Sequence, residues 1–143
     1  MNSFISPSVP ATLRQSPISW AQIPGCGRGI VSCRMLRADA VLEVAPAIPT
    51  DIAACGAGIA QYLFVIDRER RESLPKNFKA THALVFGMMS FCNHAHDPNA
   101  RVYFNMDHGG IEACLIATKP ISVRDEVTIG YPDLAWYQIK ELL

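Results

Sequence analysis

The strongest constraint on the fold is a pair of strand patterns around a turn in the second half of the chain. Residues 100–105 and 111–118 have the composition of strands, and Asp107-His108-Gly109-Gly110 lies between them. That sequence is typical of a hairpin turn, because its glycines adopt the positive φ angles that tight hairpins need. Lys119-Pro120 ends the second strand. The chain is therefore predicted to contain an antiparallel β-sheet.

The rest of the chain offers short segments of both kinds. Further strands are predicted at 30–33, after a glycine turn, at Val41–Val44, where Pro46 and Pro49 end the strand, and at 127–131. Helices are predicted over 51–64, with Thr50 or Asp51 as the cap, over 81–92 as a short buried helix, and over 134–143. The charged segment 68–79 is predicted to be a surface loop. Short strands dominate, so the fold class is mainly β.

Length and composition indicate one domain with a substantial core. The chain has 143 residues, of which 50% are hydrophobic and 18% are charged. We expect a Ser/Pro-rich arm at 1–19, the folded domain at 20–132 and a C-terminal segment at 133–143. Thirteen basic residues balance thirteen acidic ones, which argues against direct binding of nucleic acid or of an anionic membrane.

Five scattered cysteines form no C-x-x-C pair. This pattern predicts neither a disulfide framework nor a zinc site, and we expect buried thiols in a reducing compartment. The sequence has no signal-peptide pattern and no apolar run long enough to cross a bilayer. The expectation is a soluble intracellular protein, with nucleus and cytoplasm left open.

Three separated motifs and one shorter element resemble a known family. The motifs are GCGRG at 25–29, NHAHDPN at 93–99 and ISVRDEVTIGY at 121–131, and the shorter element is Tyr62-Leu63-Phe64. In this order they resemble SET-domain lysine methyltransferases, whose patterns are G-x-G, N-H-S-x-x-P-N, I-x-x-G-E-E-[LI]-T-[IF]-x-Y and Y-[LM]-F. The resemblance covers roughly residues 20–136 and is greatest to the minimal virus-type SET proteins without cysteine-rich flanking modules.

The resemblance implies small curved β-sheets around a C-terminal pseudoknot, with few short helices. The last strand would thread under an earlier loop and bring Asn93 and His94 beside Tyr131. It also implies methyl transfer from S-adenosylmethionine to a protein lysine, with S-adenosylhomocysteine (SAH) as product and no metal. Because a free lysine has a pKa of about 10.4, the site must lower that pKa and align the reacting atoms.

The resemblance also implies roles for individual residues. Tyr131 would be the catalytic tyrosine and Tyr62 would line the lysine channel, while Glu126 would have a structural role near the threaded loop. The cofactor-binding residues would be Gly27, Arg28, Gly29, Asn93, His94 and Trp136. Structural alternatives stay open: a tight turn at the glycines, an Asx-type turn at Asn93, a buried strand-end tyrosine at Tyr62 and a helix anchor at Trp136.

Four positions depart from the family pattern. Ala95 replaces a serine, and Arg124 replaces a turn glycine, so that turn must avoid positive φ or bear strain. Arg28 and Ala135 stand where the short members carry tyrosines, which predicts a wider channel and leaves open a weakened catalysis.

The leading hypothesis is a protein lysine methyltransferase acting on an exposed lysine of a histone tail or another basic protein segment. The alternative is a catalytically weak or inactive SET-fold module that binds cofactor or protein partners. A third hypothesis is a β-rich interaction domain unrelated to methylation. The apolar segment 134–143 would pack either against a second copy, giving a homodimer, or against the protein's own core.

Overall fold

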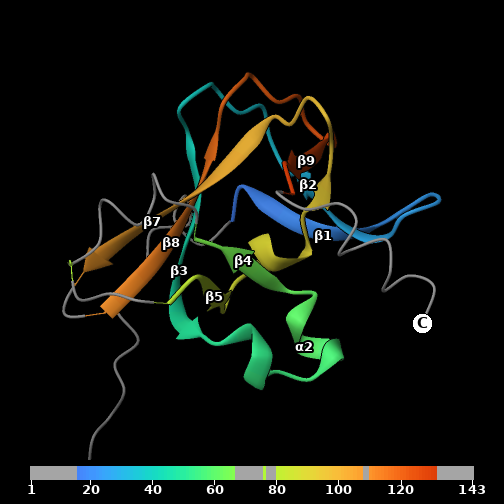
Figure 1. Cartoon of the computed structure of the whole chain (residues 1–143). Coiled ribbons are helices and arrows are strands. Elements are labelled where there is room, and N and C mark those ends of the chain that lie inside the picture. Colours follow the sequence, from blue (N-terminus) through green and yellow to red (C-terminus); the bar gives the residue numbers. More distant parts are fainter. Residues whose placement is uncertain (1–15, 67–75, 77–79, 108–109, 132–143) are drawn as a thin grey trace, which may run out of the picture.

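The computed structural model describes residues 16–66, 76, 80–107 and 110–131, which form two small, curved β-sheets (Figure 1). The first sheet has the order β1–β2–β9–β6, with β1 at Ile18–Ile23, β2 at Gly27–Ser32, β9 at Glu126–Ile129 and β6 at Asn93–His94. The second has the order β4–β5–β3–β8–β7, with β4 at Leu63–Val65, β5 at His82–Val85, β3 at Val41–Thr50, β8 at Gly110–Ala117 and β7 at Ala100–Asp107. This confirms the predicted mainly β architecture.

The predicted hairpin forms the long edge of the second sheet. β7 and β8 are antiparallel and pair continuously from Ala100↔Ala117 to Asp107↔Gly110. The residues of β8 that face the core are Ile111, Ala113, Leu115 and Ala117, and the residues between them are partly exposed. This alternation follows from the two-residue period of a strand. The strands predicted at 30–33 and 127–131 are also present, as β2 and β9 with shifted ends.

The prediction that Pro46 and Pro49 end the strand begun at Val41 is wrong, since β3 continues to Thr50. Neither proline interrupts a ladder. The Pro46 carbonyl accepts a hydrogen bond from Phe86 N. The hydrogen bond that Pro46 cannot donate would go to the same residue, and Phe86 follows the last residue of β5. Pro49 faces the opposite side, where the pairing of β3 with β8 has already ended at Ala47↔Ile111.

The helix predicted over 51–64 is replaced by a 3-10 turn, a four-residue helix and, from Leu63, the start of β4. The 3-10 turn η1 spans Ile52–Ala54, and Asp51 caps it, as predicted, by accepting a hydrogen bond from Ala53 N at 3.0 Å. The helix α2 spans only Ala57–Ala60. Gly56 separates the two with extended dihedral angles (φ −66°, ψ 155°), because glycine favours continuing a helix less than alanine does.

The buried helix predicted over 81–92 is also wrong. The segment forms β5 and then the 3-10 turn η2 at Met88–Phe91. The spacing of Leu84, Met88 and Phe91 satisfies a helical period, but a short apolar run is compatible with either structure. Pairing with β3 on one side and β4 on the other decides for the strand.

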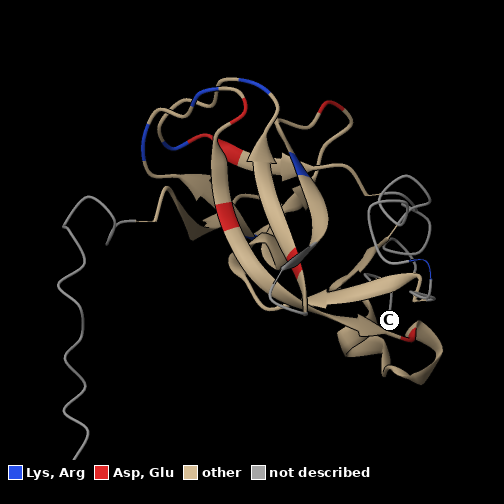
Figure 2. Cartoon of the chain, turned by 90° about the vertical axis from the view of Figure 1, so that its left-hand side faces the viewer, with Lys and Arg blue, Asp and Glu red and all other residues tan. Residues whose placement is uncertain are grey.

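One cluster of buried apolar side chains joins the two sheets. Its largest fully buried members include Ile18, Ile30, Met89, Leu115 and Val127. The described strands carry few charges, and most of the Lys and Arg residues that the structure describes lie in the loops at one end of the molecule (Figure 2). Two of these loops are joined by the Leu36↔Ile121 bridge.

The expectation of buried thiols holds only in part. Cys92 is buried, and Cys55 and Cys114 are half-buried, but Cys26 and Cys33 are exposed. All five are free. The exposed pair lies in turns that follow strands, where the apolar neighbours in sequence are not neighbours in space.

Several expectations lie wholly or mainly outside the described residues: the arm at 1–19, the loop at 68–79 and the segment at 133–143. Within the described part, β1 begins at Ile18. None of the described helices is long and apolar enough to span a membrane. Among those same residues, no group of three or more His, Cys, Asp or Glu side chains is placed to hold a metal ion.

Candidate functional site

The site is organised by a parallel pairing between segments that are far apart in sequence. β6 pairs with β9 through Asn93↔Thr128 and His94↔Ile129. The chain leaves β9 and reaches Tyr131, whose backbone N–H donates to His94 Nδ1 at 2.9 Å. The predicted proximity of Asn93 and His94 to Tyr131 is therefore confirmed.

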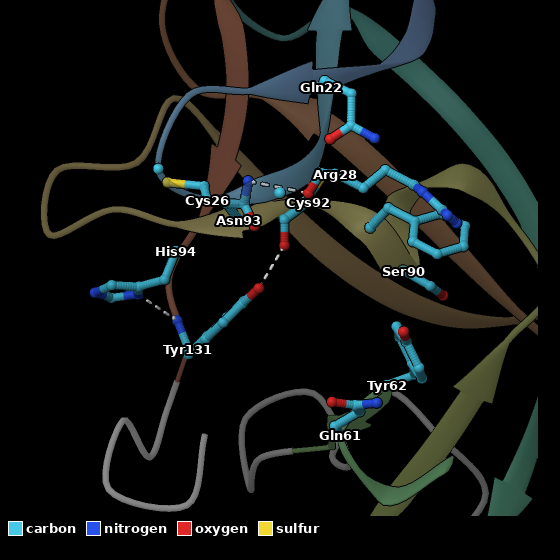
Figure 3. A pocket seen from close by; sticks show the side chains of 13 residues that line it. Gln22, Cys26, Arg28, Gln61, Tyr62, Ser90, Cys92, Asn93, His94 and Tyr131 are labelled. Atoms are coloured by element: carbon cyan, nitrogen blue, oxygen red, sulfur yellow. Dashed lines mark hydrogen bonds between the residues drawn. The ribbon is translucent and has the colours of Figure 1, made fainter. Parts of the chain in front are cut away.

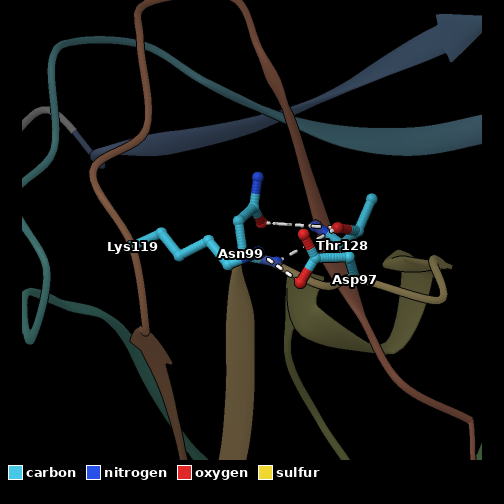
Figure 4. A network of polar contacts seen from close by, with 4 residues as sticks. All are labelled: Asp97, Asn99, Lys119 and Thr128. Atoms are coloured by element: carbon cyan, nitrogen blue, oxygen red, sulfur yellow. Dashed lines mark hydrogen bonds and ion pairs between the residues drawn. The ribbon is translucent and has the colours of Figure 1, made fainter.

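The loop that follows β6 is tied to β9 by an asparagine side chain (Figure 4). Asn99 Oδ1 accepts from Thr128 N and Asn99 Nδ2 donates to the Glu126 carbonyl, both at 2.9 Å. An exposed ion pair between Lys119 and Asp97 lies beside this contact. The amide thus replaces a neighbouring strand for two backbone groups of β9.

These elements surround a cleft of about 740 Å³ (Figure 3). Six of the predicted site residues line it: Gly27, Arg28, Tyr62, Asn93, His94 and Tyr131. The sequence analysis assigned no site role to the other lining residues, which are Gln22, Gly25, Cys26, Gln61, Ser90, Phe91 and Cys92. Trp136 and Ala135 lie outside the described residues. The predicted residues come from four separate segments, and only the tertiary fold brings them together.

Two hydrogen bonds determine how Tyr131 is presented. Its hydroxyl donates to the Cys92 carbonyl at 2.6 Å, which directs the hydroxyl proton toward that carbonyl. His94 accepts from the Tyr131 backbone at Nδ1, which requires a neutral ring with the proton on Nε2. Burial, and then the nearby His96, lowers the pKa of His94 and favours that neutral form.

The glycines of the first motif act in two different ways. Gly25 and Gly27 have positive φ angles of 77° and 79°, which side chains rarely adopt, and Gly27 lies in the cleft wall. Gly29 has no such angle. A Cβ there would lie 2.7 Å from Asn93 Nδ2 and 2.9 Å from Glu126 Oε1. Gly29 therefore makes room for the Asn93 side chain and does not itself line the cleft.

A carboxylate that the sequence analysis missed supports the opposite wall. Glu43, on β3, accepts hydrogen bonds from Met88 N at 2.9 Å and from Met89 N at 2.8 Å. It thereby caps η2, the turn that carries Phe91 and leads to Cys92. A glutamate inside a strand gives no sequence signal for capping a turn more than forty residues away.

Aromatic side chains cover one end of the cleft. The Arg28 guanidinium lies over the rings of Phe91 and Trp20, with centroid distances of 5.1 and 5.8 Å. Tyr62 packs edge-on against Phe91 at 5.9 Å. A second cavity of only about 30 Å³ adjoins the cleft and shares Tyr62, Ser90 and Tyr131 with it.

The chemistry of the lining fits a polar ligand of nucleoside size that has a flat apolar part. The volume lies within the ordinary range for small-molecule sites. Acceptors are present at the Tyr131 oxygen and on the Asn93 amide, and flat apolar surface is present at Phe91. His94 Nε2 is a buried donor without a partner among the described residues, which a ligand acceptor would satisfy.

Comparison with known proteins identifies the fold. The family model described as the SET domain matches residues 27–132. The chain belongs to the SET-domain family. The SET domain therefore includes both sheets from β2 onward, and all described cleft residues except Gln22, Gly25 and Cys26 lie inside the matched range.

Solved structures resemble this SET domain in fold. One is a candidate histone methyltransferase from Plasmodium falciparum, with TM-score 0.64 and 20% identity over 82% of this chain and 94% of that one. Another is KRYPTONITE in complex with mCHG DNA and SAH, with TM-score 0.57 and 19% identity over 81% of this chain but only 23% of that one. No curated protein sequence matches the chain.

Proposed function

We propose that this SET domain is a protein lysine methyltransferase that uses S-adenosylmethionine. The observation that carries the proposal is the convergence of Tyr131, Asn93, His94 and the Gly27–Arg28 backbone on one cleft. These residues come from motifs that resemble those of SET methyltransferases, and the family match supports the same assignment. When bound, S-adenosylmethionine supplies a sulfonium methyl group that a neutral amine displaces, leaving the thioether SAH and a methylated lysine that loses its extra proton to solvent.

Tyr131 would orient the amine. Because its hydroxyl proton is directed to the Cys92 carbonyl, the tyrosine oxygen would act as an acceptor toward an approaching N–H or polarised C–H group. This geometry favours a lysine nitrogen held on the line of attack, and such alignment is worth several kcal/mol of barrier, roughly 7–11 in good cases. The tyrosine acts by position and does not need to exchange its proton.

The neighbouring aromatic side chains would favour the neutral lysine. Tyr62 and Phe64 line the narrow cavity next to Tyr131, together with the apolar Ile129. Removing water from an ammonium group lowers the lysine pKa from its ordinary value of about 10.4. Desolvation in this cavity therefore converts the unreactive ammonium into the nucleophilic amine.

The charge around the cleft favours a basic substrate segment. Burial, and then the carboxylates of Glu43 and Glu126, raises the pKa of the Cys92 thiol. These two carboxylates contribute a negative potential at this wall, which would attract a cationic group. A histone tail or another lysine-bearing basic segment is the substrate class we propose.

One observation favours a second candidate, a SET-fold module with weak or absent turnover. The Arg28 guanidinium lies over the Phe91 ring and places a positive charge inside the cleft. At the position of Arg28, the short family members that the chain resembles carry a tyrosine. A cation there opposes both the ammonium of lysine and the sulfonium. Turnover by the purified protein separates the two candidates.

The test compares Tyr131→Phe with Tyr103→Phe. Tyr103 is an exposed β7 tyrosine outside the cleft and serves as the matched control. SAH binding is measured by calorimetry, and methylation is measured with labelled S-adenosylmethionine and mixed histones. We expect Tyr131→Phe to bind SAH but to lose about 10²-fold or more in rate, and Tyr103→Phe to match the natural protein. Absence of SAH binding by the natural protein at millimolar concentration would contradict the proposal.

A further inference from the structure

We infer that Glu126 is a positioning residue that holds the Asn93 amide ready to accept a hydrogen bond from the ammonium group of the bound cofactor. The inference rests on the proposed function and adds to it a residue that does not line the cleft. Glu126 acts through Asn93, which does line it.

The orientation of the Asn93 amide follows from its donors. Asn93 Nδ2 donates to Glu126 Oε1 at 2.7 Å and to the Arg28 carbonyl at 3.3 Å. Both partners are acceptors only, so the NH₂ end must face them. The amide oxygen, on the other branch of the group, then points away from both partners. Among the described residues it has no recorded hydrogen bond, which leaves it as an acceptor for a ligand.

The local packing leaves little room for another arrangement. Gly29 lies against this pair, and even a methyl group there would approach Asn93 Nδ2 to 2.7 Å and Glu126 Oε1 to 2.9 Å. Without Glu126, the amide could turn and present its NH₂ end to the cleft. A donor facing an ammonium group would repel it, so the orientation decides the sign of the interaction.

Charge supports the same assignment. Glu126 is half-buried, and no cation within the described ranges lies at ion-pair distance from it. A partly desolvated carboxylate without a counter-charge is costly to hold. An ammonium group on the far side of Asn93 would compensate that charge through the polarised amide. A cationic amino group is thus the ligand feature that this arrangement favours.

The experiment measures binding of two ligands by calorimetry. SAH carries the α-ammonium group, whereas 5′-methylthioadenosine has the same nucleoside and thioether but no amino acid. The variants are Glu126→Ala, Glu126→Gln and the matched control Asp125→Ala, which removes the adjacent, exposed carboxylate of the same motif. Thermal unfolding of each variant reports whether the fold is retained.

We expect Glu126→Ala to weaken SAH binding about tenfold or more, in keeping with the loss of a charged hydrogen bond. Glu126→Gln retains an acceptor oxygen and should recover part of the loss. Methylthioadenosine binding should change by less than about twofold in every variant, and Asp125→Ala should bind both ligands normally. If Glu126→Ala does not fold, weaker binding of SAH with unchanged binding of methylthioadenosine in Glu126→Gln would support the inference.

Two results would overturn the inference separately from the proposed function. Equal losses for SAH and methylthioadenosine would give Glu126 a general structural role. Normal SAH binding by both Glu126 variants would remove any role in positioning. If the natural protein bound neither ligand, the proposed function itself would fail, and the inference with it.

Discussion

Gly29 offers the sharpest test of the site geometry, because its substitution introduces a clash whose neighbours are known. In Gly29→Ala the new Cβ would lie 2.6 Å from Ile23 Cγ1 and 2.7 Å from Asn93 Nδ2. Real Cβ atoms do not approach heavy atoms this closely, so the side chains must move. The φ angle of Gly29 is not in the left-handed region, and the effect is therefore steric and not conformational.

The magnitude follows from two opposing contributions. Overpacking of a well-packed site costs typically about 1–3 kcal/mol. Replacing a strand glycine by alanine returns about 0.5–1 kcal/mol, because the unfolded chain loses freedom. The net expectation is a loss of about 1–2 kcal/mol in the free energy of unfolding, which lowers Tm by about 3–8 °C for a domain of this size.

The assay is denaturant unfolding together with SAH binding. The control is Gly58→Ala in α2, where a Cβ would meet nothing within 4 Å. That variant should be unchanged or slightly more stable, because alanine favours helix over glycine. In Gly29→Ala the displaced Asn93 should also weaken SAH binding. A Gly29→Ala protein with natural stability and natural SAH affinity would refute the close packing of Gly29, Asn93 and Glu126.

Three further expectations concern other parts of the structure. Arg124 has a φ of 69°, a conformation that costs a residue with a side chain about 1–2 kcal/mol. Arg124→Gly should therefore raise the free energy of unfolding by about 0.5–1 kcal/mol. A decrease of that free energy in urea unfolding would contradict this. Glu43→Ala leaves the backbone N–H groups at the start of η2 without their acceptor, and should cost about 2–3 kcal/mol by the same measurement. The pKa of His94 is lowered in the fold, so the unfolded chain binds the proton more readily, and stability should fall as the pH drops below about 6.5. His94→Asn keeps an acceptor but does not titrate, so its Tm should decrease less between about pH 7.5 and 5.5. The pH dependence that remains would include His82, whose pKa is also lowered by burial. A slope of Tm against pH equal to that of the natural protein would contradict the assignment to His94.

The Arg124 turn also shows how a departure from the family pattern is accommodated. The resemblance placed a glycine at this position and required either a different turn or strain. The chain keeps the left-handed conformation, and the Arg124 N–H donates to the Ser32 carbonyl at 2.9 Å. Pairing between this turn and the end of β2 holds the conformation in place.

The sequence by itself determined the elements whose signals are local. The hairpin of β7 and β8 follows from alternating apolar residues around a glycine turn, and the Asp51 cap follows from a side chain next to the backbone that it satisfies. The motif series was likewise sufficient to identify the SET fold and six of the thirteen described cleft residues, because the motifs keep their order and spacing.

Only the tertiary structure decided the features that depend on partners distant in sequence. β5 forms in place of a predicted helix because β3 and β4 pair with it. β3 continues through Pro46 and Pro49 because the neighbouring strands have ended at the points where the N–H groups of these prolines would have donated. The same holds for Glu43 at η2 and for Glu126 at Asn93. A carboxylate carries no local sign of which amide it will meet, since that depends on how the sheets pack.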